Sequence, residues 1–312
     1  MRAVVVEHRH GLGALKDLPD PAPGPHDVLV RISVAGVNPI DWKNRDVYER
    51  PIPFVLGQDF AGVVVGTGDR VRHYAEGDRV FGIAREHGAY AELTVVPEDD
   101  RTQPVAKIPI DVGDADAAAL PTAGLTALAG VERLGLEAGQ VLLIVGVTGA
   151  VGQFAAQIAR DRGIRVAGTG RAGNAEIGDA LGIETYVAYD RDDVVQSIRT
   201  KYPNGVDAVL DLAEDAEAVK RTADVLRPGG SIASTIRAVD AEHFKERGLT
   251  GLNVNLFESP QSSREGLRSL AEMVKQGRLR VPIVAERNLV DAVAALELQK
   301  SRKIAGKIVL SI

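Results

Sequence analysis

The sequence of 312 residues contains no cysteine, a single tryptophan and no long apolar run. Without cysteine the chain cannot form disulfides, thiolate nucleophiles, or zinc and iron–sulfur sites that depend on cysteine. No apolar stretch reaches the roughly 18 to 20 residues that span a bilayer, and the N-terminal MRAVVVEHRHG turns polar too early for a secretory signal. We therefore expect a cytoplasmic protein.

A strong positive charge is also missing, since the net charge is −6 and is spread along the chain. Nucleic-acid binding needs clustered lysine and arginine, so the sequence disfavours a nucleic-acid partner. The composition, 45% hydrophobic and 26% charged, is that of a soluble globular protein. The length predicts two domains of roughly 150 residues each.

The six histidines show no metal-ligand spacing such as His-Glu-x-x-His, and nothing suggests a nucleophile triad. We therefore predict no metal site and ordinary structural roles for them. They are His8, His10, His26, His73, His87 and His243.

The pattern of apolar residues divides the chain. Residues 1 to about 109 read as short strands with turns, and VLVRISVAGV alternates as a half-buried strand does. From about 120 to 259, strand-like runs alternate with helical runs, which is typical of parallel strands with crossover helices on both faces. The last 53 residues add two helical patterns and a final strand, AGKIVLSI. The sequence predicts an α/β protein with a doubly wound, Rossmann-type domain and a β-rich unit.

A glycine-rich turn opens the alternating part. The segment VLLIVGVTGAVGQFAAQIAR, residues 141–160, passes from a buried strand to a helix through three glycines. Amides at a helix N-terminus favour an anion, so this turn predicts a dinucleotide-binding site. The alternative is a tight turn that serves only helix–sheet packing. The predicted cofactor contacts are Gly146, Thr148, Gly149, Ala150, Val151 and Gly152.

The choice between NADH and NADPH should lie in RVAGTGRAGN, at the end of the second strand. NAD sites usually place an acidic residue there, but none occurs before Glu176. Arg171 follows the strand instead, with Thr169 and Asn174 beside it, and a guanidinium can pair with a 2′-phosphate. We therefore predict NADPH. The alternative is that Arg171 is an ordinary solvated arginine.

Seven segments carry a resemblance to a known family. They are GVNPID, LGQDFAGVV, EGDRVFG, LPTAGLTAL, GVTGAVGQFAAQIA, LRPGG and the terminal GKIVL. The chain resembles the zinc-independent medium-chain dehydrogenases/reductases of the quinone oxidoreductase (zeta-crystallin-like) group. The resemblance implies a GroES-like catalytic domain from residues 1–120 and 260–312, and a Rossmann domain from residues 121–259.

The resemblance also bears on the metal. In the zinc-dependent relatives a cysteine stands where Asn38 stands here and a histidine where Gln58 stands, and neither substitute is a usual zinc ligand. Hydride delivered to a quinone or an α,β-unsaturated carbonyl needs only hydrogen-bond donors for the developing oxyanion. We therefore expect NADPH-dependent reduction of such acceptors. The alternatives are an enoyl-thioester reductase and a non-catalytic NADPH-binding protein that senses the cofactor or binds RNA or another partner.

Further site residues follow from the resemblance. Asn38 and Tyr48 are the predicted catalytic residues, near the nicotinamide and the acceptor oxygen; Asn38 alternatively caps a helix, and Tyr48 alternatively covers the core. Gln58 and Asp59 either orient the substrate or make structural hydrogen bonds. The remaining predicted cofactor contacts are Thr126, Ser234, Phe257 and Lys303, although Thr126 has the alternative of bonding back to its own helix turn.

Two expectations concern the surface. Arg302, Lys303 and Lys307 form a basic run near the C-terminus, and such runs are most often solvated. The resemblance further implies a homodimer paired through edge strands of the Rossmann domain, here SIASTI and GLNVNLF.

Overall fold

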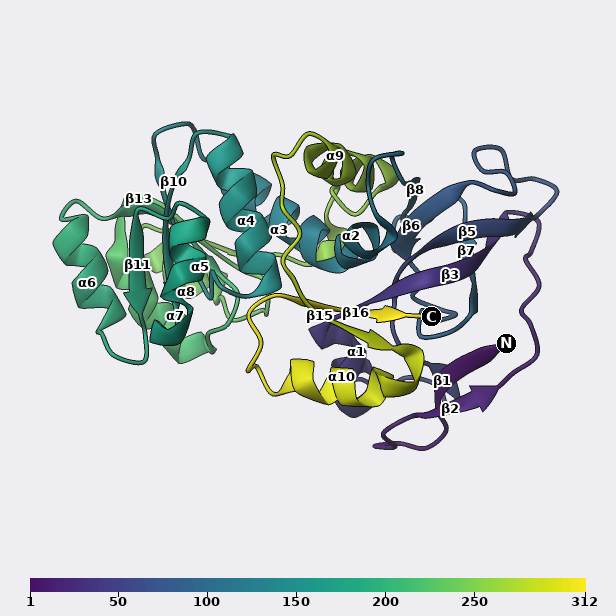
Figure 1. Cartoon of the computed structure of the whole chain (residues 1–312). Coiled ribbons are helices and arrows are strands. Elements are labelled where there is room, and N and C mark those ends of the chain that lie inside the picture. Colours follow the sequence, from purple (N-terminus) through teal and green to yellow (C-terminus); the bar gives the residue numbers. More distant parts are fainter. The chain divides into compact units, whose positions relative to one another are not determined.

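Strand β3 (Asp27–Val37) is the longest strand of the computed structural model, which describes residues 1–312 (Figure 1). Its side chains alternate as the sequence pattern predicts, with Val28, Val30 and Ile32 buried and Arg31 exposed between the last two. The strand pairs with three neighbours, all antiparallel to it.

The chain folds into two compact units. We call the first the β-rich unit, which consists of Met1–Leu125, Pro260–Gly277 and Val281–Ile312. We call the second the parallel-sheet unit, which consists of Thr126–Ser259 and Arg278–Arg280. Helix α3 (Pro121–Leu134) contributes its first residues to one unit and the rest to the other.

The β-rich unit has a seven-stranded sheet and a three-stranded sheet. In the larger sheet the order is β15-β16-β3-β5-β6-β8, with β7 paired to β3, and in the smaller sheet it is β2-β1-β4. The strands are β1 (Arg2–Val6), β2 (Ala14–Asp17), β4 (Phe54–Val55), β5 (Asp59–Thr67), β6 (Arg79–Ile83), β7 (Leu93–Pro97), β8 (Val105–Lys107), β15 (Ile283–Asn288) and β16 (Lys307–Ser311). The helices are α1 (Pro39–Asp46), α2 (Asp114–Ala119), α9 (Arg264–Lys275) and α10 (Ala292–Lys300), with the 3-10 turn η4 (Leu289–Asp291).

The parallel-sheet unit has six strands in the order β11-β10-β9-β12-β13-β14, and every pair is parallel. The predicted doubly wound fold is thereby confirmed. Its strands are β9 (Val141–Val145), β10 (Arg165–Gly170), β11 (Thr185–Ala188), β12 (Val206–Asp211), β13 (Leu226–Ser234) and β14 (Thr250–Asn253). Its helices are α4 (Ala150–Asp161), α5 (Ala175–Ala180), α6 (Val194–Lys201), α7 (Ala216–Thr222) and α8 (Ala241–Glu246), with η1 (Ala172–Asn174), η2 (Ala223–Val225) and η3 (Leu256–Glu258).

The order of the strands corrects one expectation about the surface. SIASTI was expected at a sheet edge, but its residues up to Ser234 belong to β13, which pairs with β12 on one side and β14 on the other. A strand with both neighbours filled has no free backbone groups to continue the sheet. Of the two segments, only GLNVNLF, which begins in β14, supplies an edge strand.

Every helix is too short or too polar to span a bilayer.

Candidate functional site

The glycine turn joins the end of β9 to the start of α4, as predicted. Gly146 has φ +82°, a conformation that residues with a Cβ rarely adopt. A Cβ on Gly152 would lie 2.5 Å from the Gly146 carbonyl oxygen and 2.6 Å from Val147 Cα, so only glycine lets the helix approach the turn. The N–H groups of Ala150, Val151 and Gly152 have no acceptor within the helix, because they belong to its first turn.

Thr169 holds the turn in place. Its buried hydroxyl oxygen accepts a 3.1 Å hydrogen bond from the Gly146 N–H, and its carbonyl accepts one of 2.9 Å from Val147. Thr169, predicted as a cofactor contact, therefore stabilises the conformation of the glycine turn through these two hydrogen bonds.

Arg171 follows β10 and is exposed, and its guanidinium forms no ion pair. Asn174 lies half-buried three residues later, at the end of η1. One carboxylate comes near this loop from the next strand, since Asp190 Oδ1 accepts a 2.8 Å hydrogen bond from the Ala172 N–H. Only sheet pairing brings Asp190 there, and the sequence pattern did not single it out.

Two acidic residues lie at the carboxyl end of β12, Asp211 as its last residue and Glu214 three residues later. Burial raises the pKa of Asp211, while hydrogen bonds from the Ala213 and Glu214 N–H groups and from Ser234 oppose the shift. Burial and the neighbouring Asp211 raise the pKa of Glu214, whose Oε2 is buried without a partner. The segment DLAED marks this strand end in the sequence by its acidic residues, although neither Asp211 nor Glu214 was a predicted site residue.

Ser234 was predicted as a neighbour of the nicotinamide. Its hydroxyl donates to Asp211 Oδ2 at 2.8 Å and accepts from the N–H groups of Ile236 and Ala238 at 3.2 and 3.3 Å. A hydroxyl has one donor and two acceptor positions, so none is left for a ligand. The Ser234 side chain thus fixes the end of β13.

Three other predicted cofactor contacts lie apart from the turn in the sequence. Thr126 is half-buried on α3 and Phe257 is half-buried in η3. Lys303 is exposed after α10 in the β-rich unit, and its backbone N–H donates to Ser301 Oγ at 3.3 Å.

Asn38 belongs to a buried polar network in the β-rich unit. Lys307 Nζ donates to Asn38 Oδ1 at 2.7 Å, and Asn38 Nδ2 donates to Asp59 Oδ2 at 2.8 Å. Lys307 Nζ also lies 3.7 Å from Asp59 Oδ2. All three side chains are buried, so the expectation that Lys307 is solvated is wrong. Burial lowers the pKa of Lys307 and raises that of Asp59, and the attraction between them opposes both shifts.

The same network extends to the start of α3. Thr122 donates to Asp59 through its N–H at 3.0 Å and its hydroxyl at 2.5 Å, and Gln58 Nε2 donates to Thr122 Oγ1 at 2.9 Å. Gln58 and Asp59 therefore make the structural hydrogen bonds that the sequence left as one of two alternatives. Neither residue was linked to Thr122 or Lys307 by the sequence.

Asp41 lies in the first turn of α1, as expected for the helix that Asn38 caps. Its Oδ2 accepts 2.8 Å hydrogen bonds from the Asn38 N–H and from the Tyr90 hydroxyl, while Oδ1 is buried without a partner. Burial and the nearby Asp59 raise the pKa of Asp41 to about 7. The buried network around Asn38 therefore contains two carboxyl groups with raised pKa values, Asp59 and Asp41.

Tyr48 lies beyond the other end of α1, whose eight residues span about 12 Å. It lines a cavity of about 190 Å³ together with Arg50, Ile52, Phe54 and residues of the His8–His10 turn. Tyr48 is about half exposed (51%), so a ligand in the cavity can contact it. The two predicted catalytic residues therefore occupy different surroundings, one buried and one open.

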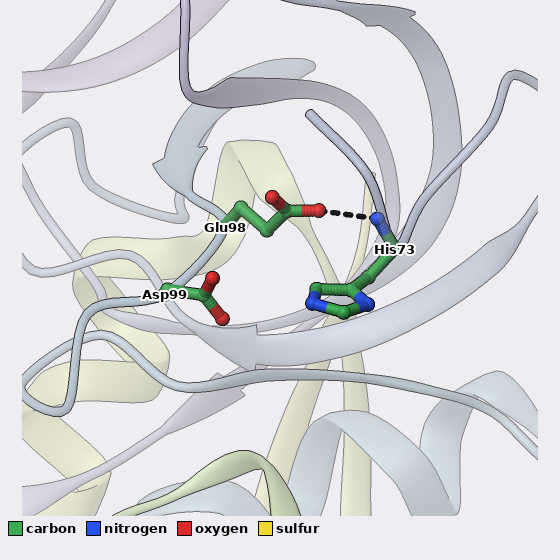
Figure 2. Close-up of side chains that lie close together, drawn as sticks. All are labelled: His73, Glu98 and Asp99. Atoms are coloured by element: carbon green, nitrogen blue, oxygen red, sulfur yellow. Dashed lines mark hydrogen bonds between the residues drawn. The ribbon is translucent and has the colours of Figure 1, made fainter. Parts of the chain in front are cut away.

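The structure brings together one group that the sequence did not predict, His73, Glu98 and Asp99 (Figure 2). Glu98 Oε1 accepts hydrogen bonds from the N–H groups of Arg72 and His73, at 2.8 and 2.5 Å. Asp99 forms a 2.6 Å ion pair with Arg264, whose charge opposes the binding of a cation there. Both carboxylates therefore have structural partners.

Known proteins match nearly the whole chain. The description "Alcohol dehydrogenase GroES-like domain" matches residues 24–109 and "Zinc-binding dehydrogenase" matches residues 181–310. The quinone oxidoreductase of Rattus norvegicus is 30% identical over 333 aligned positions, which cover 99% of this chain and 97% of that protein.

Two further relatives bear on the chemistry. The 2-methylene-furan-3-one reductase of Solanum lycopersicum is 34% identical over 233 positions, which cover 70% of this chain and 57% of that protein. A mycobacterial protein solved in complex with NADPH has a TM-score of 0.87 at 26% identity, and all of each chain is covered.

Proposed function

We propose that this chain, which belongs to the quinone oxidoreductase group of the medium-chain dehydrogenase/reductase family, reduces quinones or α,β-unsaturated carbonyl compounds with NADPH and without a catalytic metal. Membership of the family makes it an oxidoreductase of the pyridine-nucleotide-dependent type. The observation that carries the proposal is the glycine turn, with free N–H groups at the start of α4.

The turn fits the diphosphate of a dinucleotide. Gly152 lets α4 approach the turn, since a Cβ there would collide with Gly146 and Val147, and the N–H groups of Ala150, Val151 and Gly152 have no acceptor within the helix. N–H groups and the helix dipole favour negative charge at this end. These residues, with Thr148 and Gly149, would hold the diphosphate, and the bound cofactor would supply the hydride.

The exposed guanidinium of Arg171 supports NADPH over NADH. It follows β10, where a dinucleotide fold places the adenosine ribose, and it has no carboxylate partner to compete with a 2′-phosphate. Asn174 and Lys303 remain proposed contacts of the cofactor. Thr126 and Phe257 remain proposed neighbours of the nicotinamide.

Zinc does not fit the residues near Asn38. The carboxamide is held by Lys307 and Asp59, so a buried ammonium already lies 2.7 Å from its oxygen. Asp59 receives hydrogen bonds from Asn38 and Thr122, and the chain has no cysteine to complete a ligand set. The residues present favour chemistry that needs no Lewis acid.

The acceptor side of the proposal rests on Tyr48. A phenol hydroxyl can donate a hydrogen bond to the oxygen on which charge develops. Tyr48 lines the cavity, and we propose that a conjugated carbonyl bound there accepts from its hydroxyl. Asn38 does not line this cavity, but it has a second hydrogen on Nδ2 beyond the one donated to Asp59, and it remains a proposed catalytic residue near the nicotinamide.

The test is to mix the purified protein with NADPH and a panel of acceptors that includes 1,2-naphthoquinone, 1-octen-3-one and crotonyl-CoA. We expect the absorbance of reduced nicotinamide to fall with the quinone or the enone. A fall with crotonyl-CoA alone would favour an enoyl-thioester reductase. Tight NADPH binding with no acceptor reduced would show a non-catalytic cofactor-binding protein.

A further inference from the structure

The cavity that Tyr48 lines also contains Arg50, and no carboxylate neutralises this arginine. Asp41 and Glu86 act on it only from beyond ion-pair distance, while the nearby Arg85 adds a like charge. Burial and Arg85 lower the pKa of Arg50, although a guanidinium keeps its proton at neutral pH. The cavity thus holds one uncompensated positive charge.

The other permanent charges of the cavity lining are paired. Arg9 Nη1 lies 3.0 Å from Glu49 Oε1, and Arg45 forms ion pairs of 2.6 Å with Asp46 and 2.5 Å with Glu297. Glu49 and Asp46 are therefore already neutralised by arginines other than Arg50. An anion entering the cavity would meet a free cation rather than a free carboxylate.

Two contacts fix the direction of the Arg50 guanidinium. Nη2 donates to the Arg85 carbonyl at 2.9 Å, and the guanidinium lies over the Phe54 ring, 4.8 Å from its centroid. Only one of the five guanidinium N–H groups is used by the protein in this way. The others remain available for a carboxylate or a tetrahedral oxyanion such as a sulfonate, which guanidinium can bind through two N–H groups.

We infer that Arg50 binds an anionic substituent of the acceptor while Tyr48 serves its carbonyl oxygen, so the preferred substrates are enones or quinones that carry a carboxylate or sulfonate. This inference rests on the proposed function. The apolar lining from Ile52 and Phe54 would contact the carbon skeleton. The cavity, at about 190 Å³, is larger than the 150 Å³ cavities that hold benzene, and so admits at least one ring or a short chain.

The test compares two acceptors of nearly equal size, 4-oxopent-2-enoate and its methyl ester, together with 1,2-naphthoquinone-4-sulfonate and 1,2-naphthoquinone. Without a binding cation the carboxylate is the poorer hydride acceptor of the first pair. For each pair of acceptors that the wild-type protein reduces, we expect kcat/KM to be about tenfold or more higher for the anionic member, as a charge-assisted hydrogen bond allows. Added salt should reduce this preference.

Variants of Arg50 test whether this residue causes the preference for anionic acceptors. Arg50→Gln should lower the ratio of kcat/KM for anionic over neutral acceptor by about 10- to 100-fold, and Arg50→Lys should keep part of it. The double variant Arg9→Gln/Glu49→Gln is the matched control, because it removes an ion pair from the same cavity without changing the net charge, and it should leave the ratio within about threefold.

The outcomes separate this inference from the proposed function. Reduction of the neutral acceptors with no preference for the anionic ones in the wild-type protein would overturn the role of Arg50 alone. A preference that survives Arg50→Gln would also overturn it. If no acceptor of either pair is reduced, the proposed function fails and this inference fails with it.

Discussion

Lys307 Nζ donates a 2.7 Å hydrogen bond to Asn38 Oδ1, although 269 positions separate the two residues in the chain. The pairing of β16 with β3, in which Ile308 lies opposite Val37, brings them together. The bond fixes the orientation of the Asn38 carboxamide, because its oxygen faces the ammonium and its nitrogen faces Asp59. A buried lysine therefore sets the position of a residue proposed to act in the reaction.

Replacing Lys307 by methionine should destabilise the protein strongly. The change keeps most of the length of the side chain but leaves the buried Asp59 carboxylate without its cation, at a cost of about 3–5 kcal/mol in the free energy of unfolding. Lys107→Met, at an exposed ion pair with Asp78, is the control and should cost less than about 1 kcal/mol. Equal losses in urea unfolding of the two variants would contradict the importance of the buried pair.

Asp41 should make stability depend on pH between about 4 and 7. Its carboxyl, with a pKa raised from 3.8 to about 7, stays protonated in the folded chain where the unfolded chain has already lost its proton. Its contribution is therefore most favourable below pH 4 and declines as the pH rises to about 7, by roughly 4 kcal/mol over three pKa units.

Asp41→Asn tests this, because asparagine is neutral at every pH and mimics the protonated carboxyl. As the pH rises from 4 to 8, the free energy of unfolding of the wild type should fall by several kcal/mol relative to that of the variant. The charged and titratable groups nearest to Asp41, namely Asp59, Tyr90 and Lys307, stay in both proteins. Parallel stability curves would show that Asp41 does not titrate in this range.

Gly152→Ala should abolish tight NADPH binding. The new Cβ would meet backbone atoms of Gly146 and Val147 at 2.5 and 2.6 Å, so α4 would have to move away from the turn. We expect the Kd for NADPH, measured by nucleotide fluorescence, to rise about tenfold or more, which corresponds to about 1.4 kcal/mol. Gly113→Ala, where a Cβ meets nothing within 4 Å, is the control. An unchanged Kd for the Gly152 variant would place the cofactor elsewhere.

Arg171→Ala should raise the KM for NADPH far more than that for NADH. Loss of a charge-assisted pair with the 2′-phosphate corresponds to about 1.5–3 kcal/mol, or roughly 10- to 100-fold. Arg165→Ala serves as control, because Arg165 begins the same strand and pairs with Glu184. If both cofactors are affected equally, Arg171 has no part in their discrimination.

Tyr48→Phe should reduce kcat with little change in the affinity for NADPH, because only the donor to the acceptor oxygen is lost. We expect a decrease of about tenfold or more in single-turnover reduction of 1-octen-3-one. Tyr189→Phe, at a tyrosine of similar exposure (49%), is the control. Unchanged turnover would make Tyr48 a packing residue.

Periodicity predicted much of the fold. The alternation of runs gave the parallel sheet, and the helical patterns near the C-terminus correspond to α9 and α10. The helical run that ends in LRPGG is shorter than expected, because β13 begins at Leu226 and includes these residues. Strand β15 was missed, because most of its side chains are exposed and no apolar alternation marks it.

The candidate site was less predictable than the fold. The glycine turn is local, so its spacing in the sequence was sufficient. Lys307 looked like part of a solvated basic run, and only its pairing with a distant strand makes it a buried partner of Asn38 and Asp59. Arg50 likewise has no ion-pair partner because the carboxylates that line its cavity pair with Arg9 and Arg45. These pairings cannot be seen in the sequence.

The most direct measurement follows the hydrogen itself. NADPH labelled with deuterium at C4, on one face or the other, is mixed with 1-octen-3-one and protein treated with a chelator, and the product is examined by mass spectrometry. We predict one deuterium atom at the former β-carbon from one of the two labelled forms. A product without deuterium, or transfer that stops with the chelator and returns with zinc, would contradict metal-independent hydride transfer.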